Sequence, residues 1–213
     1  LSAKNISNKF SISNLNITDN DLSISNAIYG ENIAQFLLDF STISNNTSIV
    51  NSTPNGSALF LSDVNEAKIT YTTFNNNSTS SNGSSINFVN SKLNIDDTDF
   101  KNNSSQQNGG AIYNQNSFLT ITGSNFINNK AIFGGAIFSS TNTTNILNRI
   151  TFHENESQKG GAIYNDSNNP FKIISSLFSY NKATNNGGAI YNNKQISITN
   201  ATFVHNQNSA ILT

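Results

Sequence analysis

The sequence predicts an all-β protein, a right-handed single-stranded parallel β-helix (β-solenoid) of about eight coils with about 26 residues per coil. Three observations predict this fold. An apolar residue recurs at intervals close to 26 residues, an asparagine follows it three positions later, and the residues before it alternate between apolar and polar. Because one repeat governs the chain, we expect residues 1–213 to form a single β-helix segment, excised from a longer protein.

The first element is the motif Phe-x-x-Asn, whose first residue we call the anchor. The anchors are Ile17, Ile43, Phe74, Phe100, Phe126, Phe152, Phe178 and Phe203. The asparagines three residues later are Asn20, Asn46, Asn77, Asn103, Asn129, Asn155, Asn181 and Asn206. Equivalent side chains of a solenoid stack in columns about 4.8 Å apart. Stacked asparagines can bond amide to amide along the axis, so we expect these eight to form a structural ladder.

A short strand is predicted before each anchor. A branched aliphatic residue lies five positions before the anchor, and most copies have a second apolar residue seven positions before it; Ala67 and Asn145 are the exceptions. The spacing of two is typical of a strand. The segment 33–40 has helical spacing as well, but Phe36 and Leu38 fall on the repeat register, and a strand is predicted there.

The next element is the block Gly-Gly-Ala-Ile. It occurs at 109–112, 134–137, 160–163 and 187–190, with degenerate copies at 56–59, 83–86 and 208–211. Glycine accepts positive φ and permits close backbone approach, so the block predicts a tight corner followed by an inward-facing isoleucine. The predicted core therefore includes Ile112, Ile121, Phe126, Ile137, Phe152, Ile163, Phe178 and Ile190.

Composition excludes several classes of partner. Charged residues make up 11% of the chain and the formal net charge is −1, so no field favours binding to nucleic acid. The chain has no cysteine, which excludes disulfides and thiolate metal sites. No apolar run reaches the roughly 18 residues that a membrane-spanning helix needs, so we expect no membrane insertion by this segment.

The candidates for catalysis and metal binding do not converge. Asp96, Asp97 and Asp99 are expected in one strand, and the neighbouring coils supply no further carboxylate. His153 and His205 are two coils apart and are expected on opposite faces. The faint calcium pattern at residues 19–21 has too few oxygen ligands. We therefore predict no catalytic residue, no cofactor and no metal site.

The segments between the two motifs vary in length and content, and the repeat register places them along one side of the rod. Variable loops on one face of a solenoid often form its binding face; tolerated loop drift is the alternative. The candidate binding-loop residues are Ser104, Gln106, Lys130, Glu156, Lys159, Lys182 and Asn185.

The paired motifs resemble the repeats of the polymorphic outer membrane protein family, and similar repeats occur in adhesin-like surface proteins. The clearest copies pair Phe100–Asn103 with Gly109–Ile112, and Phe178–Asn181 with Gly187–Ile190. The resemblance implies a parallel β-helix, display at the cell surface and a role in adhesion.

Three hypotheses of function follow. The leading one is a non-catalytic extracellular segment of a surface adhesin that binds a glycan or protein of a host or neighbouring cell. The second is a structural stalk that displays a distal domain. The third is a polysaccharide-cleaving β-helix enzyme, which the scattered carboxylates disfavour.

Overall fold

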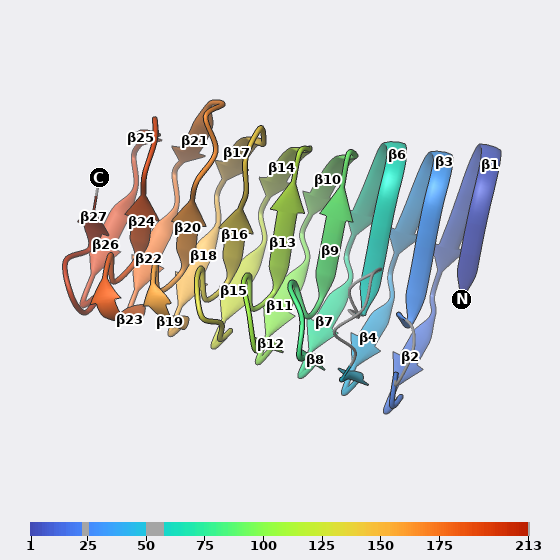
Figure 1. Ribbon diagram of the computed structural model, residues 1–213, viewed down its shortest axis with the longest axis horizontal. Coiled ribbons are helices and arrows are strands. Elements are labelled where there is room, and N and C mark those ends of the chain that lie inside the picture. The colour runs from blue at the N-terminus through green and yellow to red at the C-terminus, as the bar shows by residue number, and fades with distance from the viewer. Residues whose placement is uncertain (23–25, 50–57, 213) are drawn as a thin grey trace.

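The computed structural model describes residues 1–22, 26–49 and 58–212, which form 27 strands and no helix. The coils follow one another along a rod, with the two chain ends at its opposite ends (Figure 1). All strand pairs are parallel, and their partners lie about 26 residues apart in sequence. The rod has about seven full turns, close to the eight coils predicted, so the predicted β-solenoid is confirmed. Its right-handed sense stays a prediction.

The first sheet changes character along the rod. Its first three coils contribute strands of 12 residues: β1 (Ser2–Ser13), β3 (Ile28–Asp39) and β6 (Leu59–Thr70). Beyond β6 each coil contributes two shorter strands, so the sheet divides into two arms. One arm contains β9 (Ile86–Val89), β13 (Ile112–Gln115), β16 (Ile137–Ser139), β20 (Ile163–Asn165), β24 (Ile190–Asn192) and β27 (Ile211–Leu212). The other contains β10 (Lys92–Asp96), β14 (Phe118–Thr122), β17 (Thr144–Asn148), β21 (Phe171–Ile174) and β25 (Ser197–Thr199).

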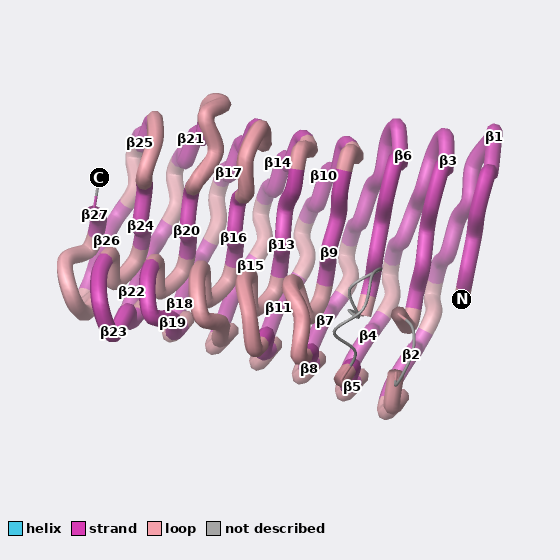
Figure 2. The backbone as a smooth tube through the Cα atoms, viewed as in Figure 1, coloured by secondary structure: helices cyan, strands magenta, loops and turns pink. Residues whose placement is uncertain are grey.

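The remaining strands form the other sides of the rod. The second sheet has one strand per coil: β2 (Asn16–Thr18), β4 (Thr42–Ser44), β7 (Thr73–Asn75), β11 (Asp99–Lys101), β15 (Asn125–Ile127), β18 (Thr151–His153), β22 (Leu177–Ser179) and β26 (Thr202–Val204). A third side follows it, with β5 (Thr47–Ser48), β8 (Ser78–Thr79), β12 (Ser104–Ser105), β19 (Glu156–Lys159) and β23 (Lys182–Asn186). Figure 2 shows how short these strands are relative to the connecting turns.

The core follows the predicted register. Phe100 pairs with Phe126, and Phe126 with Phe152. The anchor rings from Phe74 to Phe203 form a continuous stack with centroid separations of 4.6–5.2 Å. All eight predicted core residues have no exposed surface. Residues 33–39 lie in β3, as predicted, with Phe36 opposite Ala67 and Leu38 opposite Ile69, and Phe40 follows the strand at a corner.

The coils turn at columns of residues with positive φ. One column lies three positions before the anchors: Asn14, Phe40, Tyr71, Asp97, Gly123, Arg149, Ser175 and Asn200. Another lies two positions after them: Asp19, Asn45, Asn76, Asn102, Asn128, Glu154, Tyr180 and His205. The left-handed conformation costs about 1–2 kcal/mol for most side chains. It therefore persists at Phe40, Tyr71 and Arg149 because the stacked strands on both sides impose it.

This corner corrects one expectation. Asp96, Asp97 and Asp99 do not share a strand, because β10 ends at Asp96, Asp97 turns with φ 46° and β11 begins at Asp99.

The two glycines of each Gly-Gly-Ala-Ile block have different roles. Gly134 has φ 62°, so it supplies the left-handed corner. A Cβ on Gly135 would lie 2.1 Å from the carbonyl oxygen of Gly161 in the next coil. The second glycine is therefore required by close approach of two backbones. Of the degenerate copies, Gly56 and Ser57 lie outside the described residues, as does 50–55 of the variable segment before them.

Candidate functional site

The eight motif asparagines stack as one ladder. Seven bonds join them, in each of which Nδ2 donates to Oδ1 of the asparagine one coil further on, at 2.8–3.2 Å. Asn129 shows the full pattern. Its Nδ2 donates to the carbonyl of Phe100 and to Oδ1 of Asn155, and its Oδ1 accepts from both the backbone N–H and Nδ2 of Asn103. The six inner amides, from Asn46 to Asn181, are fully used within the fold, so they hold coils together and are not offered to a ligand.

A second, exposed amide ladder runs along the neighbouring corner. Asn45 donates to Asp19 and Asn76 donates to Asn45, both at 2.9 Å, and Asn128 donates to Asn102 at 2.8 Å. The column is interrupted between these two parts, because Asn102 donates to Asn75 in place of Asn76. We did not predict it. Its signal in the sequence is the pair Asn-Asn in four successive copies, of which only the second residue had been assigned a role.

The candidate binding residues lie along the third side of the rod, but most of them do not form loops. Ser104 is in β12, Glu156 and Lys159 are in β19, and Lys182 and Asn185 are in β23. The loop expectation for these five residues is therefore wrong. The backbone of Lys130 forms isolated β-bridges with Ser104 and with Glu156, and its ammonium group makes an ion pair with Glu156 at 3.6 Å. Gln106 is exposed just after β12. A partly exposed pair of this kind contributes little stability, so these charges are free to serve recognition.

A column of aromatic rings lies next to this side. Tyr113, Phe138, Tyr164 and Tyr191 stack on successive coils with centroids 4.9–5.4 Å apart. Burial raises the pKa of Tyr113 and of Tyr164 above its ordinary value. The Lys159 ammonium lies 5.0 Å from the ring centroid of Tyr191. Because each ring covers the face of the next, the column presents ring edges to solvent.

The carboxylates of the Asp96–Asp99 corner are engaged with neighbouring side chains. Asp96 pairs with Lys68 at 3.6 Å, and Asp99 accepts from Lys101 at 2.7 Å and from Asn125 at 2.8 Å. Burial raises the pKa of Asp99, but the hydrogen bonds from Lys101 and Asn125 outweigh it and hold the pKa below its ordinary value. Asp99 therefore stays ionised at neutral pH and does not act as a general acid.

The histidines are placed differently from the prediction of opposite faces. His153 and His205 both contact the ring of Tyr180, with centroids 5.6 and 5.1 Å away, so they lie at the same corner. Tyr180 lies between them and keeps them from binding one ion together. Within the described residues no group of three or more His, Cys, Asp or Glu could hold a metal ion, and no helix is present that could cross a membrane.

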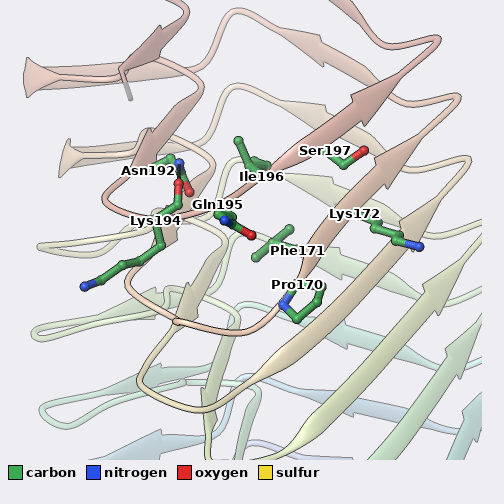
Figure 3. A pocket seen from close by; sticks show the side chains of 8 residues that line it. All are labelled: Pro170, Phe171, Lys172, Asn192, Lys194, Gln195, Ile196 and Ser197. Atoms are coloured by element: carbon green, nitrogen blue, oxygen red, sulfur yellow. Dashed lines mark hydrogen bonds between the residues drawn. The ribbon is translucent and has the colours of Figure 1, made fainter.

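One hollow of about 440 Å³ lies near the C-terminal end (Figure 3). It forms because the connection from Ile190 to Ile198 is two residues shorter than the equivalent one from Ile163 to Ile173. Pro170 and Phe171 line it from one coil, and Ile196 from the next. The ammonium groups of Lys172 and Lys194 point away from it (Figure 3), so no charged group converges on a ligand there.

Three segments match the Chlamydia polymorphic membrane protein repeat: residues 97–115, 149–166 and 175–193. Each segment contains one Phe-x-x-Asn motif and one Gly-Gly-Ala-Ile block, so the predicted resemblance is confirmed. Polymorphic membrane proteins are surface and outer-membrane proteins. Comparisons with curated proteins and with solved structures gave no match.

Proposed function

We propose that this chain is the non-catalytic, extracellular segment of a surface adhesin, which binds a glycan or protein of a host or neighbouring cell through one side of its rod. The observation that carries the proposal is the match of three segments to a repeat of surface proteins. The fold supports it, because a rigid rod with stacked coils presents the same kind of side chain at regular intervals of about 4.8 Å.

The chemistry of the described residues supports a binding role over catalysis. A glycosidase needs two carboxyl groups facing one bond. Asp96 and Asp99 are separated by a corner and engaged with lysines, and the next coil places Thr122 and Asn125 at their positions.

The third side is the first candidate for the binding surface. Its ladder column brings Ser104, Lys130, Glu156 and Lys182 into one row, with Gln106, Lys159 and Asn185 beside it. The charges in this row alternate in sign, which favours a partner with both polar and charged groups. A stalk is the second candidate, favoured by the unbroken asparagine ladder, which makes the rod stiff along its whole length.

Binding of the purified chain to whole cells, at graded protein concentration, tests the proposal. We expect saturable binding that weakens when Lys130, Glu156 and Lys182 are replaced together by serine. The matched control replaces Lys4 and Glu31, an ion pair with its nitrogen and oxygen 3.0 Å apart at the other end of the rod. Equal binding by both variants would exclude the third side, and a flat response from folded protein would favour the stalk. New reducing ends released from a polysaccharide would overturn the non-catalytic assignment.

A further inference from the structure

Phe118 differs from the other exposed aromatic residues of the described chain. Its side chain is 61% exposed, the largest fraction among them. The other three make ring contacts: Phe40 stacks on Tyr71, and Tyr180 packs against two histidines. The ring of Phe118 has no aromatic or cationic partner within the described residues. It pairs across the sheet with Lys92 and Thr144, so its faces are not covered by another ring.

The alternation of β14 explains this placement. Leu119 and Ile121 enter the core, while Phe118, Thr120 and Thr122 face outward. The register places Ile146 opposite Thr120 and Ile174 opposite Asn148. Phe118, Ile146 and Ile174 therefore form a diagonal, each step crossing one strand and two residues. Diagonal neighbours on a sheet lie about 7–8 Å apart, so the three side chains make an apolar stripe about 15 Å long.

The stripe crosses two uncharged strands and one, β21, that carries Lys172 opposite Ile146. Neither β14 nor β17 contains a charged residue. The equivalent area of the preceding coils is charged, with Lys92 bound to Glu66 at 2.9 Å and Lys68 paired with Asp96 at 3.6 Å. Beside Phe118, the side chains of Asn94, Thr120 and Thr144 make no hydrogen bond within the described residues, so their donors and acceptors are available.

We propose that Phe118 is the stacking platform of a binding site for a neutral glycan. The negative face of an aromatic ring attracts the polarised C–H groups on the apolar face of a sugar ring. Asn94, Thr120 and Thr144 supply hydrogen bonds to its hydroxyls, and Ile146 and Ile174 extend the apolar contact to the next sugar units. β14 and β17 are uncharged, and the Lys92 ammonium beside Phe118 is paired with Glu66, so the surroundings of the ring favour a neutral glycan over an acidic one. Lys172 lies two strands away, beside Ile146. This inference rests on the proposed function, because it specifies the ligand of the adhesin as a neutral glycan. It places the binding site on a different side of the rod from the Lys130 row.

The chain has no tryptophan, so Phe118→Trp introduces a single indole at the proposed site. The probes are neutral oligosaccharides of β-1,4-linked glucose, β-1,4-linked N-acetylglucosamine and α-linked mannose, with oligogalacturonate as the acidic comparison. We expect a saturable change of Trp fluorescence with at least one neutral oligosaccharide and none with oligogalacturonate. Phe40→Trp is the matched control, because Phe40 is exposed to a similar extent but stacks on Tyr71. It should show no change.

Titration calorimetry of oligosaccharide binding, with chains that carry no introduced tryptophan, completes the test. Phe118→Ala should weaken binding of the responsive oligosaccharide at least tenfold, whereas Phe118→Tyr should retain it. Equal affinity of wild type and Phe118→Ala, preference for oligogalacturonate, or no binding to any neutral probe would overturn the glycan site. If the chain still binds whole cells in any of these cases, the proposed function survives. If it binds neither cells nor glycans, both fail.

Discussion

Replacing Asn129 by alanine tests whether the buried ladder holds the coils together. The Asn129 side chain is fully buried and takes part in four hydrogen bonds: two to Asn103, one to Asn155 and one to the Phe100 carbonyl. A typical hydrogen bond contributes about 1 kcal/mol net, and an orphaned buried group costs about 1–3 kcal/mol. We therefore expect a loss of roughly 4 kcal/mol. For a chain of this size that corresponds to a fall of roughly 8–16 °C in Tm.

The assay is thermal unfolding followed by circular dichroism, with Asn128→Gly as the matched control. Asn128 is exposed, has φ 53° and donates one hydrogen bond to Asn102. Glycine accepts that φ, so the control should lose less than about 1 kcal/mol. Solenoids can unfold in parts, so amide hydrogen exchange gives a local readout. The backbone N–H of Asn103 loses its acceptor in Asn129→Ala and should exchange faster. The backbone N–H of Asn77 keeps its acceptor, Oδ1 of Asn103, and should exchange at the wild-type rate. Unchanged Tm and unchanged exchange at Asn103 would refute the reasoning.

The remaining predictions concern the corners, the core and one carboxylate. Gly135→Ala should lower stability by about 3 kcal/mol or more, because its Cβ would meet the Gly161 carbonyl, a backbone atom. Gly123→Asn should stay within about 1 kcal/mol of wild type in the same denaturation assay, since its Cβ would meet only the movable side chain of Asp97. Phe126→Ala should cost about 3–5 kcal/mol, because the ring is stacked between Phe100 and Phe152, whereas Phe118→Ala should leave urea unfolding unchanged. Hydrogen bonds from Lys4 and Tyr29 lower the pKa of Glu31 from 4.5, so an NMR titration should find its midpoint below that value. A lowered pKa stabilises the folded state above the ordinary value, and this contribution is lost as the pH falls through the folded pKa; Lys4→Met should raise the midpoint.

The sequence predicted what the repeat period determines and missed what stacking imposes. The anchors and their asparagines could be predicted because each occupies one position in every coil. The left-handed turns at Phe40, Tyr71 and Arg149 could not, because these side chains carry no local signal for positive φ. The segment 156–159 was expected to be a loop for a similar reason. Its residues have little strand preference of their own, and they form a strand by pairing with 182–186 of the next coil.

The same stacking rule indicates where recognition is to be sought on the rod. Outward columns of like residues satisfy one another: rings cover rings from Tyr113 to Tyr191, and amides bond amides along the corners. A side chain in such a column has a structural reason to be there. Phe118 lies in a column with Glu66, Lys92 and Thr144, and none of these residues has an aromatic ring that could stack on it. Stacking between coils therefore does not account for Phe118. Removing the surface of its phenyl ring from water would be favourable, but the fold leaves that surface exposed, so only a bound molecule can bury it. Binding of a ligand is the event that supplies that cover, which is why a test at this position separates recognition from folding more cleanly than any substitution within the motifs.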